Sequence, residues 1–230
     1  MKVIPPNFEF EKSLLPPGTR YLLGIDEVGR GPLAGPVTIT AFLLDLSLFD
    51  PTTFANLGVR DSKLLSPTRR QSISVHLRSF SHLTLSSSSQ DIDDQGIKAV
   101  LQDLFLSALN RFRGQFDFCL IDGNSVDLTN LAGDVHSPHH KPSLPRRCKF
   151  VVKGDQQCFS IAAASIIAKV TRDAAMDDYH RQYPQYGFDR HKGYGTSHHL
   201  AALHQHGPCP IHRRSFAPLK TLFPSNKPIT

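Results

Sequence analysis

Short apolar runs that stop at acidic residues recur three times along this chain. The acids that end these runs are, in chain order, Asp26 with Glu27 after residues 21–25, Asp122 after residues 118–121, and Asp155 shortly after residues 150–152. Runs of this length and composition are typical of buried strands. In an open α/β sheet, ligands bind beyond the strand ends, so these acids can converge on one pocket. Taken singly, each acid has a simpler interpretation as a turn former or a helix N-cap.

The remaining pattern predicts the other elements of one main α/β domain. β-Branched and aromatic residues predict a second strand at 37–44, joined to the first through a glycine loop. Ser66 and Pro67 are a typical helix start and predict a helix over 68–80. An apolar stripe at i, i+3, i+4 predicts an amphipathic helix over 93–113. The same criteria predict a polar edge strand at 83–90, a surface loop at 124–147 and a long helix at 160–183 whose small first half packs closely on the sheet.

The charge balance indicates a polyanionic partner. Lys and Arg number 26 against 20 Asp and Glu, a formal net charge of +6, and clustered basic residues bind phosphate backbones by releasing counterions.

The 4 cysteines form no CxxC pair, which argues against a disulfide framework and favours a reducing compartment. Residues 1–20 contain no continuous apolar segment, and the apolar stretch 158–168 is too short to span a bilayer. We therefore expect a cytoplasmic protein with no membrane partner. A monomer is expected because the sequence has no obvious heptad pattern and no exposed apolar face left over.

Four acids gathered in one pocket would require a cation. Asp26, Glu27, Asp122 and Asp155 would repel and raise one another's pKa values unless a metal ion joined them. Ligands that are all oxygen atoms favour Mg²⁺ or Mn²⁺. We therefore expect a divalent cation as cofactor.

A glycine loop follows the first two acids directly. Gly29 and Gly31 free the backbone to approach a ligand closely. Arg30 between them cannot lie on a helix surface there, and its alternative role is an ordinary loop salt bridge. Carboxylates beside a basic, flexible loop predict a metal and phosphate site.

These residues belong to a longer series of motifs. In chain order they are GIDEVGRGPLAGPV at 24–37, DSKLLS at 61–66, IDGN at 121–124, KGD at 153–155, SIAAASIIAKVTRD at 160–173, YPQYGFDRHKGYGT at 183–196 and GPCPIHRRSF at 207–216. Together they resemble bacterial ribonuclease HII, the type 2 ribonuclease H, over roughly residues 20–220. The resemblance implies an α/β, ribonuclease H-like fold: a central mixed β-sheet flanked by helices, with a small C-terminal helical extension. The expected organisation is an N-terminal extension at 1–19, a catalytic domain at 20–220 and a C-terminal tail at 221–230.

The resemblance also implies roles for individual residues. The expected catalytic and metal-binding carboxylates are Asp26, Glu27, Asp122 and Asp155. The expected substrate-binding residues are Gly29, Arg30 and Gly31 at the 2′-hydroxyl and phosphate, Lys63 at a backbone phosphate and Tyr194 on the neighbouring deoxyribose. A glycine loop can reach the 2′-hydroxyl, the group that distinguishes RNA from DNA. Without the resemblance, Lys63 would be interpreted as a solvated charge and Tyr194 as a core aromatic residue.

The activity implied is endonucleolytic hydrolysis of the RNA strand in RNA–DNA hybrids and on the 5′ side of ribonucleotides embedded in duplex DNA. It would leave a 3′-hydroxyl and a 5′-phosphate, with two Mg²⁺ or Mn²⁺ ions activating water and stabilising the departing oxygen. Two alternatives remain at this point. One is a noncatalytic module that binds hybrids, and the other is a different two-metal nuclease of the same fold.

Three features leave the assignment of residues open. The segment containing His136, His139 and His140 is longer than in the compact bacterial pattern, so Asp173 competes with Asp155 as fourth ligand. A second metal site, for zinc, would use His204, His206, Cys209 and His212. The basic residues expected either to widen the duplex-binding surface or merely to aid solubility are Lys192, Arg213 and Arg214.

Overall fold

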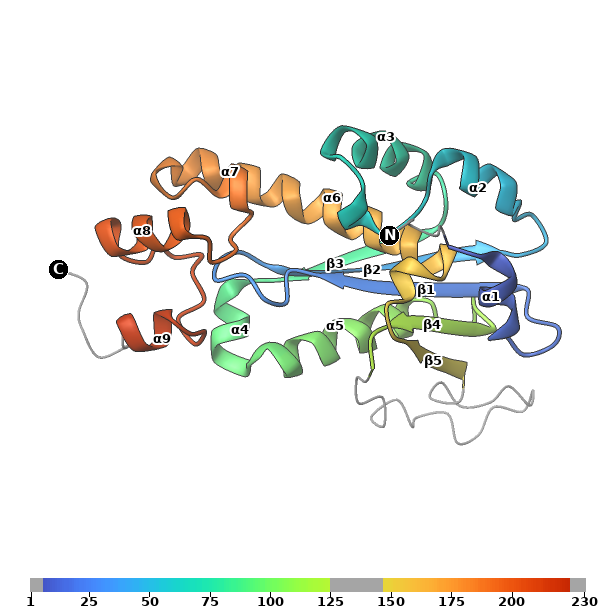
Figure 1. Ribbon diagram of the computed structural model, residues 1–230. Coiled ribbons are helices and arrows are strands. Elements are labelled where there is room, and N and C mark those ends of the chain that lie inside the picture. The colour runs from blue at the N-terminus through green and yellow to red at the C-terminus, as the bar shows by residue number, and fades with distance from the viewer. Residues whose placement is uncertain (1–5, 125–146, 224–230) are drawn as a thin grey trace. The chain divides into compact units, whose positions relative to one another are not determined.

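A five-stranded sheet forms the centre of the structure. The computed structural model describes residues 6–124 and 147–223. Its strands are β1 (Tyr21–Val28), β2 (Val37–Asp45), β3 (His82–Ser87), β4 (Phe118–Asp122) and β5 (Cys148–Val151), in the spatial order β3-β2-β1-β4-β5. β1 pairs with β4 and β4 with β5 in parallel, whereas the arrow of β2 runs opposite to that of β1 (Figure 1). The sheet is therefore mixed, as predicted.

Helices cover both faces of this sheet, with α5 and the first half of α6 on opposite sides (Figure 1). The helices are α1 (Phe8–Ser13), α2 (Pro51–Leu57), α3 (Pro67–Leu77), α4 (Ser89–Gln95), α5 (Ile97–Arg111), α6 (Phe159–Gln182), α7 (Phe188–His191), α8 (Ser197–His206) and α9 (Leu219–Leu222). Short 3₁₀ turns are η1 (Ser62–Leu64), η4 (Gly154–Gln156) and η5 (Pro184–Tyr186).

The chain divides into two compact units, each with its own apolar core. The first comprises residues 1–27, 39–85 and 102–170, and the second comprises residues 28–38, 86–101 and 171–230. The core of the second unit includes Met176, Tyr186, Phe188 and Leu203. The boundaries expected at residues 19 and 220 stay a prediction.

Close packing between β1 and the start of α6 shapes the first unit. Ala162, Ala163 and Ala164 are fully buried, and a Cβ atom at Gly24 would lie 2.4 Å from the carbonyl carbon of Ser160. The two backbones can approach this closely only because the residues between them are small. The predicted close contact between the small first half of this helix and the sheet is confirmed.

Most of the other predicted elements are confirmed, and one is wrong. Ser66 accepts a hydrogen bond from the Arg69 N–H at 3.3 Å and caps α3 as expected. The expected single helix at 93–113 is instead α4 and α5, separated at Gly96. That residue adopts φ 83° and ψ 146°, which no helix accommodates. The surface loop predicted at 124–147 falls mainly outside the described residues, as do His136, His139 and His140.

Candidate functional site

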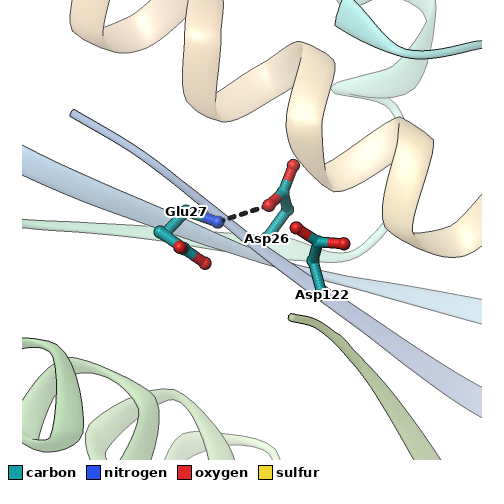
Figure 2. Close-up of side chains that lie close together, drawn as sticks. All are labelled: Asp26, Glu27 and Asp122. Carbon is teal, nitrogen blue, oxygen red and sulfur yellow. Dashed lines mark hydrogen bonds between the residues drawn. The ribbon is translucent and has the colours of Figure 1, made fainter. Parts of the chain in front are cut away.

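Strand pairing places two acids side by side. β1 and β4 are parallel with Ile25 opposite Ile121, so the next residue on each strand is Asp26 or Asp122. The carboxylates of Asp26, Glu27 and Asp122 each place one oxygen within 4.8 Å of the others (Figure 2). The Glu27 N–H also donates to Asp26 Oδ1 at 2.7 Å. Three of the four acids singled out from the sequence thus come together at the ends of neighbouring strands.

Asp155 lies beside this group, in the 3₁₀ turn η4 that precedes α6. The N–H of Gly154 donates to Asp122 Oδ1 at 2.6 Å, which ties the turn to the end of β4. Asp155 is buried, and its charge raises the pKa of Asp26. Its competitor in the sequence, Asp173, belongs to the second compact unit.

The acids carry an electrostatic conflict that a cation would relieve. Burial raises the pKa of Asp26 well above its ordinary value, and the neighbouring charges of Asp122, Glu27 and Asp155 raise it further. Burial also raises the pKa of Asp155 to about 6, with Lys63 opposing the rise and Asp61 and Asp122 adding to it. A set of oxygen ligands in this electrostatic state fits a hard divalent cation such as Mg²⁺ or Mn²⁺.

Lys63 is directed at the acidic group and not at bulk solvent alone. Its Nζ lies 3.4 Å from Asp155 Oδ2, although its side chain is 75% exposed. Asp61 holds the turn that carries it, because one carboxylate oxygen accepts from the Lys63 N–H at 2.9 Å and the other from Gln156 Nε2 at 3.2 Å. The lysine therefore has a defined position at the rim of the acids, with surface left for another partner.

The two glycines of the loop after β1 differ in what they require. Gly29 is buried with φ 90°, and a Cβ atom there would lie 2.2 Å from Arg172 Nε. A Cβ atom at Gly31 would meet no other atom within 4 Å. Gly29 is therefore needed for the shape of the loop, whereas Gly31 keeps one exposed stretch of backbone uncovered.

Arg213 sets the direction of the peptide groups in this loop. It is fully buried and donates hydrogen bonds to the carbonyl oxygens of Gly29, Arg30 and Gly35. In a planar trans peptide the N–H points away from the C=O of the same unit. The N–H groups of Arg30 and Gly31 therefore point away from the guanidinium, and both residues are exposed. The expectation that Arg213 widens the duplex-binding surface is wrong, because burial hides it.

Arg172 holds the rest of the loop in the same way. Also fully buried, it donates to the carbonyl oxygens of Ala34, Pro36 and Lys192 at 2.8 to 3.2 Å. Burial, together with the charge of Arg172, lowers the pKa of Arg213 to about 9, and burial also lowers the pKa of Arg172. Neither arginine was assigned this role from the sequence, where no local pattern marks a basic residue as buried.

Tyr194 is not a core residue. Its side chain is 44% exposed, while its backbone carbonyl contacts His199 Nδ1 at 2.9 Å and its N–H donates to the carbonyl oxygen of His191 at 2.9 Å. The core interpretation is therefore wrong. An anchored backbone with an exposed ring suits contact with a ligand.

The four residues of the alternative zinc site do not come together. His204 and His206 are exposed, whereas Cys209 and His212 are buried. His212 Nδ1 lies 3.1 Å from Cys209 Sγ, and its Nε2 lies 3.0 Å from His199 Nε2. Within residues 6–124 and 147–223, the acids around Asp26 are the group whose ligand atoms lie close enough to share a metal ion.

Comparison with known proteins agrees with this fold and identifies the family. The family model of ribonuclease HII matches residues 23–219. Ribonuclease HII of Chlamydia abortus is 42% identical over 217 residues, which are 93% of this chain and 92% of that protein. Ribonuclease HII of Bacillus licheniformis is 41% identical over 215 residues, 92% of this chain and 75% of that protein. The crystal structure of ribonuclease H2 from Pyrococcus horikoshii OT3 superposes with a TM-score of 0.71 at 26% identity, covering 88% of this chain and 96% of that one.

The mixed sheet with acids at its strand ends defines an α/β enzyme of the ribonuclease H-like class. More specifically, the chain belongs to the ribonuclease HII family, and it is a ribonuclease H. Among the helices of the described residues, none has the length and apolar character needed to span a bilayer.

Added Mg²⁺ or Mn²⁺ should stabilise the protein more strongly as the pH rises. The folded-state pKa of Asp155 is raised from 3.8 to about 6, so without metal its contribution to stability falls as the pH rises through this range. The cation binds the charged form and reverses that loss. At about a hundredfold excess over Kd, the melting temperature should increase by roughly 5–10 °C at neutral pH. Thermal unfolding with and without metal measures this, and an equal increase near pH 4 would contradict it.

Alanine in place of Gly29 should destabilise the protein, whereas alanine in place of Gly31 should not, because only Gly29 is required by the backbone conformation of the loop. Gly29→Ala should lower the free energy of unfolding by about 1–3 kcal/mol, because alanine is strained at positive φ and its Cβ would meet Arg172. Gly31→Ala should change it by less than about 0.5 kcal/mol. Urea denaturation measures both variants, and equal losses would show that the loop has another shape.

Proposed function

We propose that this protein hydrolyses the RNA strand of RNA–DNA hybrids and cuts duplex DNA on the 5′ side of embedded ribonucleotides. The products would carry a 3′-hydroxyl and a 5′-phosphate. The observation that carries the proposal is the group of one buried carboxylate, Asp26, and two half-buried ones, Glu27 and Asp122, at the ends of β1 and β4, in a chain of the ribonuclease HII family. A cluster of this kind supports metal-assisted phosphodiester hydrolysis without a covalent enzyme intermediate.

In this proposal, Asp26, Glu27, Asp122 and Asp155 hold two divalent cations. When bound, these ions supply an activated water and stabilise the charge on the departing oxygen. The chain's own contribution is to hold the carboxylates in place before metal arrives. Strand register does so for Asp26 and Asp122, and the Gly154 N–H does so for the turn that carries Asp155. Four carboxylates and two divalent cations together are close to neutral, which permits an anionic substrate to approach.

Selectivity for ribose is assigned to the glycine loop. The N–H groups of Arg30 and Gly31, two exposed residues, point away from Arg213 because Arg213 binds the carbonyls of the same peptide units. Rigid backbone donors can bind a 2′-hydroxyl or a phosphate oxygen without the entropy loss of ordering a long side chain. Gly29 follows Glu27 by two residues. The proposed ribose-binding loop is therefore joined directly to the strand that carries the proposed metal ligands.

Two further side chains complete the proposed substrate contacts. Lys63, exposed beside Asp155, would bind a backbone phosphate near the cut. The exposed ring of Tyr194 would pack on the deoxyribose next to the ribonucleotide. Together with the loop, such contacts would recognise the step from RNA to DNA.

A noncatalytic module that binds hybrids is a weaker explanation of the same features. Clustered acids lower the affinity for a phosphate backbone unless metal is bound. A binding module gains nothing from burying Asp26 and raising its pKa. A metal-dependent enzyme, in contrast, needs clustered carboxylates to bind its cations.

Asp26→Asn should abolish cleavage while leaving the fold and much of the substrate binding intact. Because a catalytic metal contributes several kcal/mol to lowering the barrier, loss of a ligand should reduce the rate by roughly 10³-fold or more. The measurement is Mg²⁺- or Mn²⁺-dependent incision of a DNA duplex that contains one ribonucleotide. Asp103→Asn, at an exposed position of α5, is the matched control and should cut at the wild-type rate.

The matched all-DNA duplex tests the selectivity in the same assay. The wild-type enzyme should leave it intact, because it lacks the 2′-hydroxyl. Incision of both duplexes at the same rate would refute recognition of ribose, and full activity of Asp26→Asn would refute the carboxylate site.

A further inference from the structure

A buried carboxylate near the N-terminus holds the segment that leads from the candidate site into α6. Glu11, in the short helix α1, has no exposed surface. One oxygen accepts from the Phe159 N–H at 2.9 Å, and the other accepts from the Ser160 N–H at 3.0 Å and from the Ser160 hydroxyl. Phe159 and Ser160 are the first two residues of α6. Glu11 thus binds donors at the start of a helix to which it does not belong.

The position suits a charged carboxylate. The first N–H groups of a helix have no partner within it, and the helix dipole favours an anion at this end. Burial raises the pKa of Glu11, while the hydrogen bonds from Ser160 and Phe159 counteract the rise. Because Gly24 of β1 leaves no room for a side chain against Ser160, the first turn of α6 is fixed by Glu11 and by the strand that carries Asp26.

The same short segment is bound at its other end by an acid of the candidate site. The Gly154 N–H donates to Asp122 Oδ1, and the Cys158 N–H donates to the carbonyl of Gly154 at 2.8 Å. Residues 154–160 are therefore held by Asp122 at the start and by Glu11 at the end. Asp155 lies within this span, and its backbone has little freedom to move while both contacts persist.

We propose that Glu11 is a positioning residue for the metal site: by binding the start of α6, it fixes the turn that presents Asp155 next to Asp122. The inference rests on the proposed role of Asp155 as a metal ligand. It gives the N-terminal helix, which lies before the residues matched by the family model, a part in metal binding. Without the Glu11 contacts the turn can shift, and Asp155 then no longer lies at the distance from Asp122 that a shared cation requires.

Glu11→Gln tests the proposal, with Glu9→Gln as the matched control on the same helix. Gln retains the size of Glu but brings an amide N–H₂ group against the N–H donors, whereas Glu9 is exposed. The measurement is the Kd for Mn²⁺ by titration followed by electron paramagnetic resonance, well below the melting temperature. Loss of a group that orients metal ligands typically weakens metal affinity by roughly 10-fold to 100-fold, which we expect for Glu11→Gln and not for Glu9→Gln.

The metal dependence of cleavage distinguishes positioning from a purely structural role. Glu11→Gln should need correspondingly more Mn²⁺ for half-maximal cleavage and recover most of its rate at high Mn²⁺. A lower melting temperature with unchanged Mn²⁺ affinity would overturn the proposal. If Glu11→Gln does not fold, Ser160→Ala removes one of the three donors, and it should weaken Mn²⁺ binding in the same direction. Unchanged Mn²⁺ affinity in a folded Ser160→Ala protein would then overturn the proposal.

Asp155→Asn, measured in parallel, separates this inference from the proposed function. If Asp155→Asn weakens Mn²⁺ binding and Glu11→Gln does not, the positioning role fails while the carboxylate site stands. If Asp155→Asn leaves both Mn²⁺ binding and cleavage unchanged, Asp155 is not a ligand, and the proposed function fails at that residue together with the role of Glu11.

Discussion

Repulsion among carboxylates held at the ends of parallel strands is the constraint on which the rest of this structure depends. The register of β1 against β4 sets Asp26 beside Asp122, and burial of Asp26 removes the water that would screen its charge. The strands cannot slide apart to relieve the repulsion without breaking their hydrogen-bond ladder. Protonation of the acids relieves it at low pH, and a bound divalent cation would relieve it at neutral pH. The fold thus fixes the positions of these acids, and in the proposed function they form the cation site.

Two backbone segments with proposed functional roles are each held by buried ionisable side chains. Arg172 and Arg213 bind the carbonyl oxygens of the glycine loop, and Glu11 binds the amide groups at the start of α6. In both cases a charged side chain is solvated by backbone dipoles, which satisfies the energetic requirement for burying a charge. A backbone partner cannot rotate away as a side chain can. The result is a preorganised main chain, which lowers the entropy lost when metal or substrate binds.

The acids were predictable from the sequence because a strand end is a local feature. An apolar run followed by Asp26 or Asp122 can be identified without knowing its neighbours, and the parallel arrangement then brings the two ends together. Gly96 is also a local feature, but the helix predicted over 93–113 ran across it, so the break between α4 and α5 was missed. The position of Asp155 depends on the contact between Gly154 and Asp122, which are 32 residues apart, and no periodicity encodes such a contact.

The burial of charged side chains was the feature that the sequence predicted least well. Arg213 occurs among basic and polar residues and was expected at the surface, yet its partners Gly35 and Gly29 lie 178 and 184 positions earlier in the chain. Glu11 occurs in a charged stretch typical of a solvated helix, and its partners lie 148 and 149 positions later. Side-chain chemistry alone does not show whether an ion faces water or a distant peptide group. Only the tertiary structure distinguishes these two environments.

Anomalous X-ray diffraction from crystals soaked in Mn²⁺ tests the central claim most directly, because it locates the ion independently of activity. The arrangement of the acids predicts Mn²⁺ peaks within coordination distance of the carboxylates of Asp26, Glu27, Asp122 and Asp155. Mn²⁺ bound elsewhere, for example at Cys209 and His212, with these carboxylates unoccupied at saturating metal, would contradict it.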